Sequence, residues 1–197
     1  MAVDAVNGVP QADEVPSRSL SRGRLQVLVV AASAAGAALA AGTLGRFGLT
    51  ANGVAWAAAE LLLVFLAAFD IATRRVPNRV TAPAAIVVIL LRVAFEHSAL
   101  VEMFVAGAVA FAVFLLIAVV GRGGLGIGDV KLAGLLGLLL GTAAVPALFL
   151  GVIVGGIASA AVLVTHRGQR GRTIAYAPYL CFGGAIAIVA FAVPALI

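Results

Sequence analysis

The feature that most constrains this chain is a succession of long apolar runs separated by short polar segments. The first run, residues 25–44, has about the twenty residues that an α-helix needs to cross a bilayer. Hydrophobic residues make up 63% of the chain and charged residues 11%. Soluble domains are about half apolar and a quarter charged. Because a bilayer offers backbone groups no water to bond, the expected fold class is all-α, a polytopic membrane helix bundle.

Six further spans are expected after the first, which makes about seven transmembrane helices. Their expected bounds are 53–70, 80–97, 100–120, 129–142, 144–165 and 174–196. The span 129–142 is short, and little more than residues 142–146 joins it to the next, so the two form either a tight hairpin or one broken element. An N-terminus in the cytoplasm places every Lys and Arg except Arg46 and Arg92 on the cytoplasmic side. The positive-inside rule therefore predicts an N-in, C-out topology.

The spans also predict a simple domain organisation. Residues 1–24 are polar, with prolines and an arginine-rich stretch, so we expect a disordered cytoplasmic tail there. Residues 25–44 form an additional N-terminal transmembrane helix, which is longer than the apolar region of a usual signal peptide and is expected to stay uncleaved. Residues 53–197 form the membrane core.

Charge and cysteine content exclude several classes of function. The net charge of +5 is spread in short arginine clusters between apolar runs, a pattern of membrane orientation and not of a nucleic-acid surface. We therefore expect the lipid bilayer as a partner and no nucleic acid. The single cysteine, Cys181, excludes an intrachain disulfide and a multi-cysteine metal site. Neither a metal nor a cofactor is expected.

Two aspartates stand out in this apolar sequence. Asp70 ends one apolar run and Asp129 precedes another, and the predicted topology puts both at cytoplasmic helix ends. An ionisable group at bilayer depth is costly, so it marks a functional site. Carboxyl groups that share a site do not both ionise readily, and one stays protonated, which suits acid–base chemistry. The pair therefore predicts a catalytic dyad inside the membrane.

Each aspartate also has a simpler interpretation. Asp129 closes Gly-Ile-Gly-Asp at residues 126–129, where a glycine-rich loop turns into a helix. Those glycines permit positive φ and leave room for a second chain, as peptide hydrolysis requires, but an Asp there can equally cap the helix. Asp70 can pair with Arg74, four residues later, as an ordinary surface ion pair. The residues alone leave these alternatives open.

Three stretches together resemble the type IV prepilin peptidases, the GxGD class of intramembrane aspartic proteases. They are Asp70 followed by basic residues and Val-Pro-Asn at 76–78, Gly-Ile-Gly-Asp-Val-Lys-Leu at 126–132, and Tyr-Ala-Pro-Tyr-Leu at 176–180. The resemblance implies that Asp70 and Asp129 are the catalytic pair, one as general base and one as general acid, without saying which. It also implies a substrate-binding or active-site loop region that includes Pro77, Asn78, Gly126, Gly128 and Pro178.

The resemblance further implies an aspartic endopeptidase of the cytoplasmic membrane, with its active site toward the cytoplasm. Members of the family cleave the positively charged leader of prepilins or pseudopilins, next to a hydrophobic segment that stays in the membrane. The chain has none of the paired CxxC motifs associated with N-methylation, since Cys181 is single. The short, peptidase-only form is therefore implied.

A different class of function also fits two intramembrane carboxyl groups. A proton-coupled transporter or channel uses such groups as relays. In transporters, however, they usually lie near the midplane among broken helices, whereas here both lie toward one face. The relay function therefore stays the alternative.

Two further features are expected to serve the bundle itself. Glu60 lies ten residues before Asp70, about 15 Å deeper at 1.5 Å per residue, and is expected to hydrogen-bond within the bundle or tune its hydration. Gly151 and Gly155 have the spacing that lets membrane helices approach closely, and we expect them to pack helices of the same chain.

Overall fold

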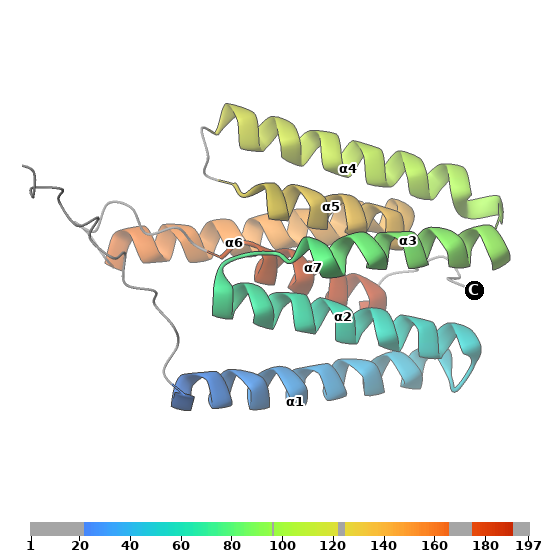
Figure 1. Ribbon diagram of the computed structural model, residues 1–197, viewed down its shortest axis with the longest axis horizontal. Coiled ribbons are helices and arrows are strands. Elements are labelled where there is room, and N and C mark those ends of the chain that lie inside the picture. Colours follow the sequence, from blue (N-terminus) through green and yellow to red (C-terminus); the bar gives the residue numbers. More distant parts are fainter. Residues whose placement is uncertain (1–21, 96, 122–124, 166–174, 191–197) are drawn as a thin grey trace, which may run out of the picture.

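The computed structural model describes residues 22–95, 97–121, 125–165 and 175–190, which are helical apart from short turns. The helices in chain order are α1 (Arg22–Phe47), α2 (Ala51–Thr73), α3 (Asn78–Phe95), the 3-10 helix η1 (His97–Ala99), α4 (Leu100–Val120), α5 (Ile127–Leu140), the 3-10 helix η2 (Gly141–Ala143), α6 (Ala144–Thr165) and α7 (Ala177–Ala190). They lie side by side in one bundle, and successive α-helices run in alternating directions (Figure 1). The all-α fold class is confirmed.

Five segments of the described chain are long and apolar enough to cross a membrane. Four correspond to α1, α2, α3 and α4, and the fifth runs from Ile127 to Val162. Within the fifth segment, the chain reverses at η2, where Gly141 has a φ of 58°. Of the two predicted alternatives, α5 and α6 therefore form the hairpin and not one broken element (Figure 1). The apolar helix α7 has 14 residues, and residues 191–197 of the predicted last span lie outside the described residues. A multi-pass membrane protein follows from these helices.

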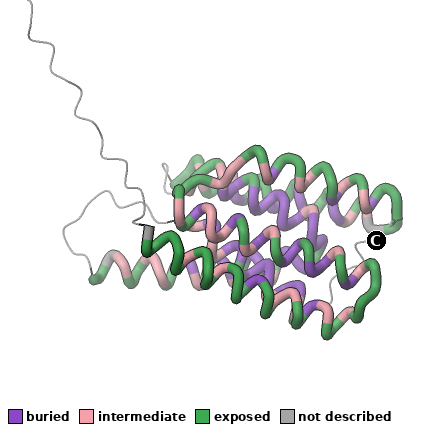
Figure 2. Tube along the Cα trace, turned by 60° about the horizontal axis from the view of Figure 1, so that its bottom comes forward, coloured by how far each residue is buried: buried purple, intermediate pink, exposed green. Residues whose placement is uncertain are grey.

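Helix α5 lies at the centre of the bundle, with α3, α4, α6 and α7 packed against it. Ten of its 14 residues are buried. The outward faces of the surrounding helices, by contrast, carry exposed Val, Leu, Ile and Phe side chains (Figure 2). An apolar outer face is what a bilayer requires, because lipid cannot solvate polar groups.

Small residues set how closely these helices approach. A Cβ atom on Gly137 of α5 would lie 2.6 Å from the Ala106 carbonyl oxygen of α4, closer than such atoms come. Gly151 and Gly155 of α6 lie in the same way against Leu180 and Tyr176. The predicted intramolecular packing by these two glycines is therefore confirmed.

The additional first helix is part of the bundle. Helix α1 packs along α2 and also contacts α7. The Thr43 hydroxyl of α1 donates a hydrogen bond of 3.3 Å to Oε1 of Glu60 on α2, and both residues are fully buried. The predicted hydrogen bonding of Glu60 within the bundle is confirmed, and its partner comes from α1.

Candidate active site

Asp70 lies one turn before the end of α2, because this helix continues to Thr73, three residues beyond its predicted end. The helix ends at Arg74, which has the left-handed conformation (φ 53°, ψ 37°) and donates its backbone N–H to the Asp70 carbonyl oxygen at 2.6 Å. This conformation is uncommon for a residue with a side chain, so the turn stores local strain. The turn leads the chain directly into α3. The Arg74 charge also acts on the Asp70 carboxyl, but Asp70 is buried and not the surface residue that the simpler interpretation expected.

Asp129 lies in the first turn of α5, where its carboxyl caps the helix. The backbone N–H of Gly126 donates to Oδ2 of Asp129 at 3.1 Å. The capping interpretation expected an Asp at the N-cap, whereas the N-cap is Gly126 and Asp129 is the third residue of α5, which reaches back to it. A carboxyl group has about four acceptor positions, however, and this bond occupies one of them. Capping and chemistry are compatible roles for the same side chain.

The two aspartates line one cavity, of about 340 Å³. Both side chains are buried, with 4% of Asp70 and 8% of Asp129 exposed. The end of α2 and the beginnings of α3, α5 and α7 all lie at the same end of the bundle (Figure 1). Besides the aspartates, the wall includes Arg74, Arg75, Val76, Asn78, Gly126, Ile127, Gly128 and Lys131.

The N-terminus of α7 completes this site. The backbone N–H of Ala177, its first residue, lies beside the carboxyl groups of both Asp70 and Asp129 and acts electrostatically on both. The first N–H groups of a helix have no partner inside the helix and favour negative charge beside them. The two carboxyl groups also act on each other electrostatically. The structure thus brings together two residues that are 59 positions apart in the sequence.

One carboxyl oxygen in this site has no hydrogen bond. Oδ2 of Asp70 is buried and has no partner among the described residues. Leaving a buried polar atom unpaired costs about 1–3 kcal/mol. This oxygen is therefore ready to bond a water molecule or a peptide group that enters the cavity.

Gly128 allows the connection between α2 and α3 to pack on the start of α5. A Cβ atom on Gly128 would lie 2.9 Å from Cβ of Val76 in that connection. Any side chain at residue 128 would push the two segments apart. The connection follows the helix that carries Asp70, and Gly128 directly precedes Asp129, so this contact holds two walls of the cavity together.

Two of the residues predicted for the site do not line the cavity. Pro77 precedes α3, and its carbonyl oxygen accepts hydrogen bonds from the N–H groups of Val80 and Thr81. Pro178 lies in the first turn of α7, where its fixed φ favours the start of a helix. Both shape the backbone next to the cavity, whereas Asn78, Gly126 and Gly128 form its wall.

The sequence analysis missed the part played by Tyr176 and Ala177. The Tyr176 hydroxyl donates to the Val152 carbonyl oxygen at 3.2 Å. Burial, together with the nearby Asp129, raises the pKa of Tyr176. Residues 176–180 mark this region in the sequence, but the group that reaches the carboxyls is the backbone N–H of Ala177. The sequence signal that could have identified this N–H group is Pro178, because a proline is typical of the first turn of a helix, where N–H groups lack partners within the helix.

Lys131 lies two residues after Asp129 and takes part in the cavity wall. Its Nζ donates to Oδ1 of Asn78 at 3.0 Å, which links α5 to α3. This bond fits the structural role that its place on the helix suggests. Within the described ranges, no group of three His, Cys, Asp or Glu residues has a geometry that could hold a metal ion.

Comparisons with known proteins identify the family of this chain. The model of the type IV leader peptidase family matches residues 57–161, which is more than half of the 197 residues and includes both aspartates. Searches of curated proteins and of solved structures gave no match. The helix α7 lies outside the matched segment, although it contributes the Ala177 N–H. Membership implies an aspartic peptidase, and the chain belongs to the type IV leader peptidase family.

Proposed function

We propose that this protein is an endopeptidase that removes the leader peptide of prepilin-like proteins at the cytoplasmic face of the membrane, with Asp70 and Asp129 as its catalytic pair. One observation carries the proposal above the others. In a member of the leader peptidase family, the two carboxyl groups are buried in the wall of one cavity, beside the N-terminus of α7. Family membership supports prepilins or pseudopilins as the substrates.

The chemistry follows from two carboxyl groups that share a proton. The ionised carboxylate takes a proton from a water molecule as the water oxygen attacks the scissile carbonyl carbon. The protonated carboxyl donates a hydrogen bond to the carbonyl oxygen and stabilises the charge that develops there. As the C–N bond breaks, the leaving nitrogen receives a proton, and the products are a carboxyl group and a free amine. The shared proton belongs to the pair and not to one residue.

The cavity also suits an extended peptide. Gly126 and Gly128 carry no side chain at the wall next to Asp129, so a substrate backbone can come within contact distance of the carboxyl. Asn78, an exposed residue, also lines the cavity, and its amide offers both a donor and an acceptor to that backbone. Pro77 and Pro178 hold the two flanking turns.

The orientation in the membrane forms part of the proposal. The cavity end of the bundle carries Arg74, Arg75 and Lys131. The last turns of α1 and α3, at the other end of the bundle, carry Arg46 and Arg92. The positive-inside rule then places the cavity in the cytoplasm, with seven spans, the N-terminus inside and the C-terminus outside. Among the other arginines that support this topology, Arg22, Arg24 and Arg79 are described, whereas Arg18, Arg122, Arg167, Arg170 and Arg172 lie outside the described residues.

Co-expression with candidate prepilins tests the proposal. Mass spectrometry of the prepilin N-terminus is expected to show a shortened chain with the intact protein and the full leader with the Asp70→Asn variant. An uncleaved prepilin beside correctly inserted, intact protein would contradict the proposal. Flux that depends on a pH gradient in liposomes, without any cleavage, would favour the proton-relay alternative instead.

A further inference from the structure

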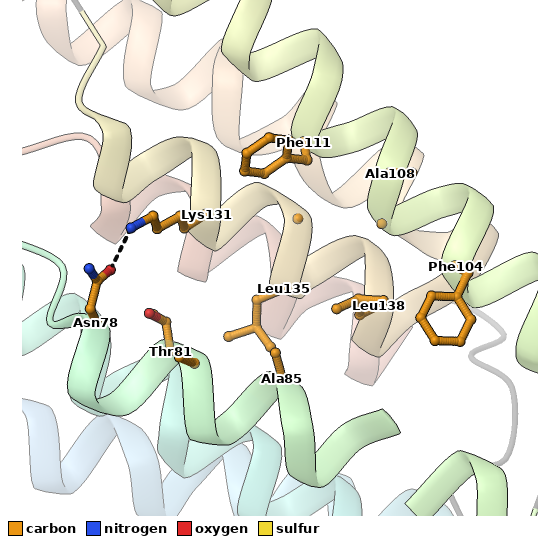
Figure 3. A pocket seen from close by; sticks show the side chains of 12 residues that line it. Asn78, Thr81, Ala85, Phe104, Ala108, Phe111, Lys131, Leu135 and Leu138 are labelled. Atoms are coloured by element: carbon orange, nitrogen blue, oxygen red, sulfur yellow. Dashed lines mark hydrogen bonds between the residues drawn. The ribbon is translucent and has the colours of Figure 1, made fainter. Parts of the chain in front are cut away.

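A second hollow lies next to the aspartate cavity, and it is apolar. It occupies about 530 Å³ between α3 and α4, with α5 as its floor. Figure 3 shows the side chains of the three helices around it. We call it the α3–α4 groove, defined by Ala85 of α3, Phe104, Ala108 and Phe111 of α4, and Leu135 and Leu138 of α5.

The groove exists because α3 and α4 separate above α5. Each of the two helices packs on α5, but they make few contacts with each other. Phe104 and Phe111 border the gap and stay 47% and 40% exposed. The groove therefore opens to the lipid along the outside of the bundle, where another apolar helix can reach it.

The α3–α4 groove adjoins the aspartate cavity. Asn78 and Lys131 line both hollows, and the hydrogen bond between them lies at one end of the groove (Figure 3). Lys131 is only two residues from Asp129, about 3 Å along the helix axis. A peptide that leaves the cavity past this pair of residues enters the groove directly.

The dimensions and surface of the groove suit a helix. The stretch from Lys131 to Leu138 on its floor covers about 10 Å, or two helical turns. Ala85 of α3 and Ala108 of α4 line the groove, and their small side chains leave room for another helix to come close. Without a hydrophobic driving force in lipid, membrane helices associate through such close contacts between small residues.

A second apolar groove on the same molecule provides a comparison. It has about 370 Å³ and lies between α1 and α2, where residues such as Ala32, Gly36 and Leu61 line it. None of the residues that line it also lines the aspartate cavity. Apolar character alone therefore does not distinguish the α3–α4 groove, whereas its connection to the two carboxyl groups does.

We infer that the α3–α4 groove binds the hydrophobic segment of the substrate as a helix, so that the bond before this segment lies over Asp70 and Asp129. The inference rests on the proposed function. The order of the two hollows, polar and then apolar, matches the order of a substrate whose polar leader precedes an apolar segment. The junction at Asn78 and Lys131 then marks where the substrate changes from extended chain to helix.

Filling each groove in turn tests the inference. Ala108→Phe places a large side chain in the α3–α4 groove, and the matched control Ala32→Phe does the same in the α1–α2 groove. With the prepilin that the intact protein cleaves, Ala108→Phe is expected to raise KM about tenfold or more, with a small change in kcat, while Ala32→Phe leaves both unchanged. Equal effects of the two variants, or none from Ala108→Phe, would overturn the inference.

Crosslinking tests the same contact without relying on turnover. The only natural cysteine, Cys181, is buried, so an introduced cysteine is the reactive one. In the Asp129→Asn background, we expect Ala108→Cys, but not Ala32→Cys, to form a disulfide with a cysteine placed two turns into the hydrophobic segment of the prepilin. No crosslink at residue 108, or equal crosslinks at both residues, would overturn the inference. If the intact protein cleaves no prepilin, the proposed function fails and this inference falls with it.

Discussion

The aspartate cavity and the α3–α4 groove adjoin each other but differ in how the chain builds them. The cavity lies at helix ends, where free N–H groups such as that of Ala177 and the left-handed turn at Arg74 place polar groups beside the carboxyls. The groove lies mostly along helix middles, where backbone groups bond within the helix and most lining side chains are apolar. We therefore expect helix ends in this bundle to supply the chemistry and helix middles to supply the binding. Changes in the cavity should lower kcat, and changes along the groove should raise KM.

The largest effect is expected from the two aspartates. Asp70→Asn and Asp129→Asn each remove a group that exchanges a proton, so cleavage should fall by at least about 10² to 10⁴-fold, with insertion and abundance unchanged. N-terminal mass spectrometry of the prepilin measures the loss. Glu102→Gln is the control, because its remaining oxygen can still accept from Thr142 at the opposite end of the bundle. Cleavage at the normal rate by either Asn variant would remove the cavity from the chemistry.

Gly128 should show how sensitive the cavity is to the separation of its two sides. Gly128→Ala places a Cβ atom 2.9 Å from Cβ of Val76, and the resulting shift should lower kcat by about 10 to 100-fold. Adding Val76→Gly removes the clashing atom and should restore part of the activity. Gly156→Ala is the matched control, because nothing lies within 4 Å of its Cβ position. A Gly128→Ala protein with normal kcat would show that the contact with Val76 does not position the carboxyls.

Lys131 lines both the aspartate cavity and the α3–α4 groove, and so lies at the junction between them. Lys131→Met removes one exposed hydrogen bond to Asn78, so the expected loss in kcat/KM is small, about fivefold at most. Steady-state cleavage of the prepilin separates the two parameters. A loss of kcat as large as that of the aspartate variants would assign Lys131 to the chemistry and not to the junction.

The smallest effect is expected from Glu60, the other buried carboxyl of α2. Glu60→Gln keeps an acceptor for the Thr43 hydroxyl, so cleavage should stay within about twofold of normal. Thr43→Val, which removes the donor, should lower the thermal stability of the protein in detergent without changing kcat. If Glu60→Gln abolished cleavage, a third carboxyl group would belong to the reaction.

Local sequence patterns predicted the helices well, because hydropathy is a local property, and they singled out the two aspartates that line one cavity. The predicted positions of the helix ends were less accurate, because capping interactions determine where a helix begins and ends. Thr50 accepts a hydrogen bond from Gly53 N–H and starts α2 at Ala51, before the predicted residue 53, and Arg74 ends it beyond the predicted residue 70. These bonds depend on backbone conformations that an apolar pattern does not encode.

Contacts between distant segments were beyond what the sequence could predict. The N–H of Ala177 has no side chain to identify it, and its place beside Asp70 depends on how α7 packs on α2. The separation of α3 from α4, which opens the groove along Ala108, likewise depends on packing around α5. Hydropathy shows that both α3 and α4 face lipid, but it does not show that a gap lies between them.

The central claim is that Asp70 and Asp129 act as one unit, and a single comparison of rates tests it. Single-turnover cleavage of the prepilin is measured for Asp70→Asn, for Asp129→Asn and for the double variant. Residues that work together give strongly non-additive losses. We therefore expect the double variant to be no slower than either single variant. A double variant whose loss equals the product of the two single losses, or a single variant that cleaves at the normal rate, would contradict the claim.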